Sequence, residues 1–97
     1  GKPVLLYIWM DGCASCQGFE DQLQQDGAPP VFDEFVLTES QLGSAGLMDR
    51  YNVSATPALV VLTPDGGKVT DLVPTRTENL NKRLSAALER AEERMGD

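Results

Sequence analysis

The sequence predicts an α/β fold, a central mixed sheet of about four strands flanked by helices on both faces. Short, continuously apolar runs occur at residues 3–9, 35–38 and 58–62, and such runs are typical of strands buried on both faces. Segments with helical periodicity separate these runs, and a strongly amphipathic segment follows the last strand. The predicted order β-α-β-α-β-β-α therefore places one sheet between two helical layers.

Length and charge limit the class of protein. The 97 residues suit a single domain over 1–97 and leave no room for a second core. The net charge of −7 disfavours nucleic acid and anionic membrane surfaces as partners. No apolar run reaches the ~18 residues of a membrane helix. We therefore expect a monomer that does not itself insert into a membrane.

In the first half, residues 3–9 predict a strand that Asp11-Gly12 interrupts. A helix is expected from about Cys13 to Gln25, because Phe19 and Leu23 lie one turn apart on one face. The prolines at 29–30 end that helix. After the prolines we expect a turn of helix at 31–34, a second buried strand at 35–38 and a weak helix over 41–51.

In the second half, Ala58–Leu62 is the clearest strand, and the turn at 63–67 predicts a hairpin with an edge-like strand at 68–73. The first three strands should be parallel to one another where they are adjacent. Thr75–Glu78 fits a capping box before the last helix. That helix carries one apolar stripe, formed by Leu80, Leu84, Ala87, Leu88, Ala91 and Met95.

The two cysteines, Cys13 and Cys16, are the chemical centre that the sequence predicts. They close only a tiny loop, whose closure stabilises little, so their role is chemical more than structural. At a helix N-terminus, free N–H groups and the helix dipole favour a thiolate at Cys13. Cys16 lies one turn inside and is shielded. Cys13 is therefore the expected nucleophile and Cys16 the resolving thiol, with no cofactor other than their disulfide.

Three alternatives compete with this interpretation. A Cys-x-x-Cys pair can be half of a zinc or iron–sulfur site. Because the chain has no other cysteine and no histidine, such a site would need carboxylates or a metal-bridged dimer, so we expect no metal. Two inert buried cysteines are the second alternative. The third is a non-catalytic interaction module that keeps the cysteines as a latent switch.

Two motifs resemble the thioredoxin superfamily. The first is a strand followed by Trp9-x-x-x-Cys13-x-x-Cys16 and a helix, and the second is Thr56-Pro57 roughly forty residues later, directly before a strand. The resemblance implies a thioredoxin-like fold in which the Thr56–Pro57 peptide bond is cis and faces the disulfide. It also implies that the backbone before Pro57 pairs with an extended segment of a protein substrate.

Within the superfamily, the chain is most similar to the C-terminal thioredoxin-like domain of DsbD-type thiol:disulfide interchange proteins. This resemblance rests on Gly1-Lys2-Pro3-Val4 before the strand and on Phe19-Glu20 after the cysteines. It implies electron transfer between protein thiols and disulfides in the bacterial periplasm or cell envelope, as part of or partner to a membrane protein. The cytoplasm is the alternative location.

The chain departs from the family where the redox centre is usually tuned. Tyr7 stands where thioredoxins carry a buried acid that is thought to assist proton transfer, and Gly12 replaces a tryptophan. Acidic residues such as Asp11 and Glu20 lie near the cysteines and oppose a thiolate. We therefore expect a protein-disulfide reductase, with a disulfide oxidase or isomerase as the alternative, because Thr56 is common in those relatives.

The expected substrate-binding residues surround the cysteine pair. Trp9 either shapes the surface beside the disulfide or packs under the helix, and Tyr7 is expected in the core. Met10 and three of the binding residues form an apolar rim for a partner's extended segment. The full set of expected binding residues is Trp9, Gly12, Ala55, Thr56 and Pro57.

Overall fold

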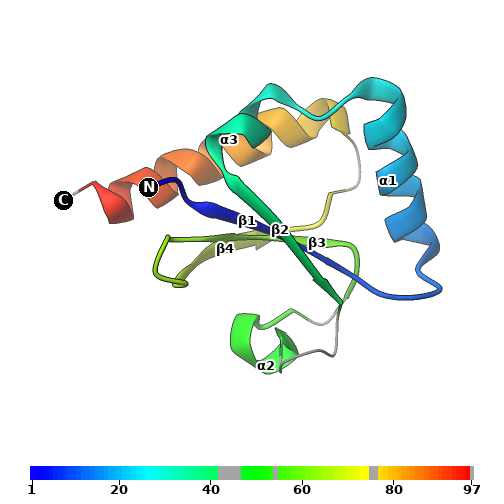
Figure 1. Cartoon of the computed structure of the whole chain (residues 1–97), viewed down its shortest axis with the longest axis horizontal. Coiled ribbons are helices and arrows are strands. Elements are labelled where there is room, and N and C mark those ends of the chain that lie inside the picture. Colours follow the sequence, from blue (N-terminus) through cyan, green and yellow to red (C-terminus); the bar gives the residue numbers. More distant parts are fainter. Residues whose placement is uncertain (42–46, 54, 75–76, 97) are drawn as a thin grey trace.

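The computed structural model describes residues 1–41, 47–53, 55–74 and 77–96 and contains a four-stranded mixed sheet (Figure 1). The α/β fold predicted from the sequence is confirmed. The strands, in the spatial order β2-β1-β3-β4, are β1 (Val4–Trp9), β2 (Val36–Gln41), β3 (Ala58–Leu62) and β4 (Lys68–Leu72). The helices are α1 (Ala14–Asp26), the 3₁₀ helix η1 (Pro30–Glu34), α2 (Leu47–Tyr51) and α3 (Thr77–Met95).

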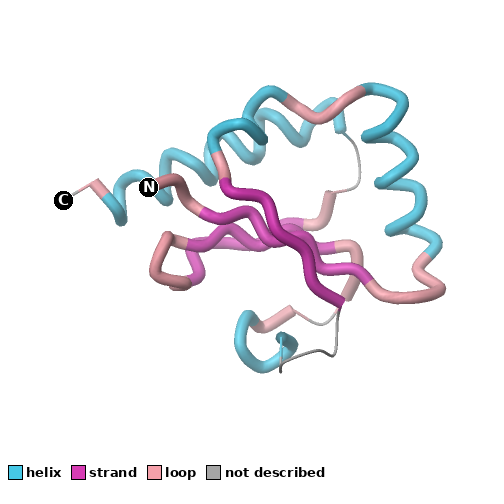
Figure 2. Tube along the Cα trace, in the orientation of Figure 1, coloured by secondary structure: helices cyan, strands magenta, loops and turns pink. Residues whose placement is uncertain are grey.

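Helices cover both faces of the sheet, as expected. Side chains alternate along β1, so Leu5 and Tyr7 face α1 and α3, whereas Leu6 and Ile8 face the side where α2 lies. Figures 1 and 2 show α1 and α3 on one side of the strands and α2 on the other. The larger core cluster lies on the α1 and α3 side and includes Phe19, Val61, Leu80, Leu84 and Ala91.

The expectation that the first three strands are parallel is wrong for β3. Strand β1 is parallel to β2 but antiparallel to β3, with Ile8 opposite Ala58. Because β2 is parallel to β1 and β3 is antiparallel to it, the chain enters β3 from the same end of the sheet at which β2 stops. The sixteen residues between the two strands are enough for either direction, so their number alone does not decide it.

The expectation of a second buried strand is also wrong. β2 forms an edge of the sheet, and Val36 and Leu37 are 52% and 55% exposed. Phe35, which is buried, precedes the strand. The strand also extends to Gln41, where the helix predicted over 41–51 was expected to begin, and α2 forms the described part of that helix. A continuous apolar run does not distinguish an edge strand from a central one.

The last helix forms as predicted. In the stripe of α3, Leu80, Leu84, Ala87 and Ala91 are buried, and Leu88 and Met95 pack against them. The capping-box residues Thr75 and Arg76, and Leu42 of the weak helix, lie outside the described residues.

Candidate active site

A tight turn at the end of β1 positions the cysteine pair. Trp9 is the last residue of β1, and Asp11-Gly12 carries the chain into α1. Gly12 has φ of 76°, a left-handed conformation that side chains with a Cβ rarely adopt. Cys13 is the N-cap residue of α1, and Cys16 lies inside the first turn. The predicted placement at the helix N-terminus is therefore confirmed.

Cys13 and Cys16 form a disulfide, with their Cα atoms 5.2 Å apart. The two sulfur-bearing residues differ in access, since Cys13 is half-buried and Cys16 is only 3% exposed. An attacking thiol must meet a partner, whereas a resolving thiol needs to reach only its neighbour. The difference in burial favours Cys13 for the first role and Cys16 for the second.

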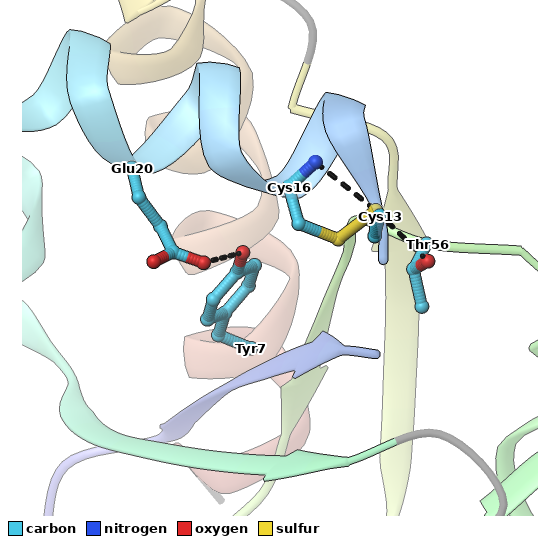
Figure 3. The surroundings of a disulfide bond; sticks show 5 residues. All are labelled: Tyr7, Cys13, Cys16, Glu20 and Thr56. Atoms are coloured by element: carbon cyan, nitrogen blue, oxygen red, sulfur yellow. Dashed lines mark hydrogen bonds between the residues drawn. A yellow bond between two sulfur atoms is a disulfide. The ribbon is translucent and has the colours of Figure 1, made fainter. Parts of the chain in front are cut away.

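Two hydrogen-bond donors point at the Sγ atom of Cys13 (Figure 3). The backbone N–H of Cys16 donates to it at 3.0 Å, and the Thr56 hydroxyl donates at 3.2 Å. The Thr56–Pro57 peptide bond is cis and directly precedes β3. Donors that face a sulfur atom stabilise its anionic form once the disulfide is reduced. This arrangement therefore favours a thiolate at Cys13.

The disulfide lies between two hollows. A cleft of about 360 Å³ extends from Trp9 past the cysteines to Glu20. A groove of about 420 Å³ runs between α1 and the loop that carries Pro57, with Ser15, Gln22 and Val73 among its lining residues.

The expected binding residues divide between these surfaces. Trp9, which is half-buried, and Gly12 line the cleft, whereas Thr56 and Pro57 line the groove. Ala55 is exposed beside them. Pro57 is buried, so its side chain lies beneath the expected apolar rim and only Met10, Gly12 and Ala55 are at the surface.

Acidic and amide side chains surround the cleft. Asp11 accepts a hydrogen bond from Gln41 at 3.2 Å. Glu20 accepts one from the Tyr7 hydroxyl at 2.8 Å. Burial, this hydrogen bond and the negative charges of Glu20 and Glu39 hold the pKa of Tyr7 well above its usual range. Tyr7 therefore remains a protonated donor at neutral pH.

Two features of the site were missed from the sequence. Tyr7 was assigned only to the core, yet its hydroxyl contacts Glu20 at the surface. Glu20 follows Cys16 by four residues, which places both on one face of a helix. The four-residue spacing between Cys16 and Glu20 was therefore the sequence signal that Glu20 lies at the site. The side chain of Thr56 was also not expected to donate to Cys13.

Two kinds of feature are absent from the described residues. Within 1–41, 47–53, 55–74 and 77–96, no group of three His, Cys, Asp or Glu side chains could hold a metal ion. In the same residues, no helix has the length and apolar character needed to cross a bilayer.

Comparison with curated proteins identifies relatives of this chain. It is 38% identical over 78 residues to the thiol:disulfide interchange protein DsbD 1 of Pseudomonas aeruginosa, a match that covers 74% of this chain and 13% of that protein. The DsbD of Haemophilus ducreyi is 26% identical over 91 residues, covering 88% of this chain and 16% of that protein. The chain thus spans less than a fifth of the length of these relatives. No family model matches it.

Solved structures agree on the fold. A thioredoxin from Thermus thermophilus superimposes with a TM-score of 0.72 at 24% identity, covering all of this chain and 81% of that one. A structure described as DsbH oxidoreductase gives the same TM-score at 20% identity, covering 91% and 73% of the two chains. The chain is therefore a thioredoxin-fold protein that matches the C-terminal region of the DsbD thiol:disulfide interchange proteins over most of its own length.

Proposed function

We propose that this chain is a thiol–disulfide oxidoreductase that exchanges a dithiol for a disulfide with protein partners and acts as the reductant. The observation that carries the exchange chemistry is the asymmetry of the cysteine pair, and the acidic surroundings of the cleft carry the reducing direction. Cys13 is accessible and receives two hydrogen bonds on its sulfur, whereas Cys16 is buried one turn inside α1. In the reduced form, the Cys13 thiolate attacks a partner disulfide, and Cys16 then displaces the reduced partner from the mixed disulfide.

The surfaces beside Cys13 support a protein partner. Met10 is 44% exposed, Gly12 and Ala55 are also exposed, and the groove along Thr56 and Pro57 opens next to the disulfide. An extended segment of the partner could lie along this groove, with main-chain hydrogen bonds supplying affinity. Trp9 and Gly12, which line the cleft on the other side, complete the proposed binding surface.

The acidic surroundings support the reducing direction. Asp11 and Glu20 line the cleft around the cysteines, and none of the described residues that line it is basic. Negative charges oppose a thiolate, which makes the reduced form a better electron donor. A reduction potential near −120 mV, the value of strong oxidants, would contradict this direction. A value at or below about −200 mV would support it.

The relatives suggest where the reaction takes place. DsbD proteins are named for thiol:disulfide interchange, and we place this chain in the bacterial cell envelope, on the periplasmic side. Its electrons would pass to protein disulfides there. Expression of the protein from its own gene, followed by cell fractionation, tests this location. Recovery of the chain only in the cytoplasmic fraction would refute it.

The roles of the two cysteines can be tested by trapping. In Cys16→Ser, the mixed disulfide with a partner cannot be resolved, so a covalent complex should accumulate on Cys13 and disappear on treatment with dithiothreitol. Non-reducing electrophoresis and mass spectrometry of the linked peptides identify the attached cysteine. Cys13→Ser is the matched control and should trap little. Equal trapping in both variants, or none in either, would refute the assignment.

A turnover assay separates this enzyme from a non-catalytic module. Reduced wild-type chain should reduce insulin with dithiothreitol as the electron source, and both cysteine variants should be inactive. A wild-type chain that binds partners but does not accelerate insulin reduction would refute the proposed activity.

A further inference from the structure

Lys68 connects the start of β4 to the end of α2. Its Nζ atom donates to the main-chain oxygen of Tyr51 at 2.5 Å and forms an ion pair with Oδ2 of Asp71 at 2.5 Å. Because the Lys68 side chain is only 29% exposed, water and salt screen these contacts less than at an open surface. None of these three residues takes part in the function proposed above.

The short helix α2 depends on such contacts. Its five residues, Leu47–Tyr51, are too few for a helix that is stable on its own in water. The carbonyl of Tyr51 belongs to the last turn, where carbonyl groups lack partners within the helix and the helix dipole favours a nearby cation. Lys68 supplies both a donor and a positive charge at this carbonyl. It therefore fixes the point at which the chain leaves α2.

The segment that leaves α2 carries Thr56 to the disulfide. Asn52, directly after the helix, has φ of 57°, a left-handed conformation typical of the residue that follows a helix. Tyr51 and Val53, on either side of it, are buried against the sheet. Thr56 follows Tyr51 by five residues, and its hydroxyl donates to Sγ of Cys13 at 3.2 Å (Figure 3). The position of this hydroxyl therefore depends on where α2 ends.

The contact between Thr56 and Cys13 is sensitive to small displacements. Hydrogen bonds weaken steeply when donor and acceptor are misaligned, and the short side chain of Thr56 cannot compensate for a shift of its backbone. The other donor to Cys13, the N–H of Cys16, belongs to α1, on the opposite side of the sheet from α2 (Figure 1). A shift at the end of α2 would therefore remove one of the two donors and leave the other.

We propose that Lys68 is a positioning residue for the redox centre: by holding the end of α2, it keeps the Thr56 hydroxyl on Cys13 and so stabilises the reduced, thiolate form. The inference rests on the proposed function, in which the Cys13 thiolate is the attacking species. Lys68 acts through α2 and the loop that follows it. Asp71, three residues further along β4, helps to hold the Lys68 ammonium group in place.

The experiment measures the equilibrium between the Cys13–Cys16 disulfide and the dithiol. A residue that stabilises the oxidised and the reduced chain equally does not change this equilibrium, so the readout separates positioning from a purely structural role. The chain is equilibrated in glutathione buffers of different redox ratios, and its two forms are quantified by thiol labelling and mass spectrometry. Lys68→Met, which removes the donor and the charge, is measured alone and combined with Thr56→Val.

In Lys68→Met, we expect the equilibrium constant to shift about fivefold toward the disulfide, since complete loss of a hydrogen bond to a charged group is worth about tenfold. When Thr56→Val has already removed the hydroxyl, adding Lys68→Met should shift the constant by less than about twofold. Lys82→Met is the matched control, because it removes the same charge from an exposed position on α3. Its constant should match that of wild type.

Two results would overturn the inference. One is an unchanged constant in Lys68→Met. The other is an equal shift with and without Thr56→Val, because Lys68 would then act through its charge and not through the Thr56 hydroxyl. The proposed function fails on a separate result, the absence of insulin turnover by the wild-type chain, and the redox equilibrium is measured in either case.

Asp71→Asn keeps the test decisive if Lys68→Met does not fold. Loss of a negative charge would by itself stabilise a thiolate and shift the equilibrium toward the dithiol. A less firmly held Lys68 would instead weaken the contact between Thr56 and Cys13, so we expect a shift of about threefold toward the disulfide. That shift should vanish in the presence of Thr56→Val. A shift toward the dithiol, or none, would overturn the inference.

Discussion

Around the sulfur of Cys13, single hydrogen bonds set the relative stability of thiolate and disulfide. The N–H of Cys16 is a backbone donor, present in any helix that begins at this residue. The Thr56 hydroxyl is a side-chain donor and comes from the other side of the site, 43 residues away. The second donor can therefore be removed by substitution without disturbing the helix.

Replacing Thr56 by valine tests that donor. The change keeps the branched shape but removes the hydroxyl, so the reduced Cys13 thiolate loses stabilisation. A hydrogen bond to a charged group contributes about 1.5 kcal/mol, and about 30 mV corresponds to 1.4 kcal/mol for this two-electron couple. The reduction potential should become more negative by about 30 mV, as measured by equilibration with glutathione. Thr56→Ser retains the hydroxyl and should stay near wild type.

The strands differ in how much their side chains contribute to the free energy of unfolding. β3 is central, and all five of its residues are buried. β2 is an edge strand whose first four residues are exposed. The same residue type therefore contributes differently to stability in the two strands, because only in β3 is the side chain removed from water on folding.

A matched pair of valine substitutions tests this difference. Val60 on β3 is fully buried and Val36 on β2 is 52% exposed. Val60→Thr buries a hydroxyl among apolar side chains and should lower the free energy of unfolding by about 1–3 kcal/mol. Val36→Thr should change it by less than about 0.5 kcal/mol. Urea denaturation followed by circular dichroism measures both. Equal losses would contradict the edge position of β2.

Over the whole molecule, charge is distributed unevenly. Residues 1–48 contain seven acids and one base, whereas residues 49–97 contain eight acids and seven bases. The cysteines and the acids around their cleft belong to the first part, so the field near the disulfide is negative. Such a field attracts cationic reactants and repels anionic ones.

This field should be visible in the reactions of the reduced chain with small disulfides. Cystamine, a dication, should react about tenfold faster than oxidised glutathione at low ionic strength, after normalisation to the rate of each with a free thiol. The ratio should fall toward one in 1 M salt, where the Debye length is about 3 Å. Hydroxyethyl disulfide, which is neutral, serves as the control and should show little salt dependence. A ratio that salt does not change would contradict electrostatic steering.

The sequence by itself determined most of the local structure and the chemical centre. Apolar runs and helical periodicity located β1, β3, α1 and α3, because these patterns depend on neighbours along the chain. The spacing of Cys13 and Cys16 placed the pair at a helix start, where the N-cap geometry is also local.

Only the tertiary structure decided the order and direction of the strands and the side-chain contacts between different elements. Whether β2 lies at the edge, and whether β3 runs antiparallel to β1, depends on how the chain returns to the sheet after α2. The contacts of Thr56 with Cys13 and of Tyr7 with Glu20 join residues from different elements. Neither contact follows from a periodic pattern, because the pairing of distant side chains is set by packing of the whole fold and not by local propensity.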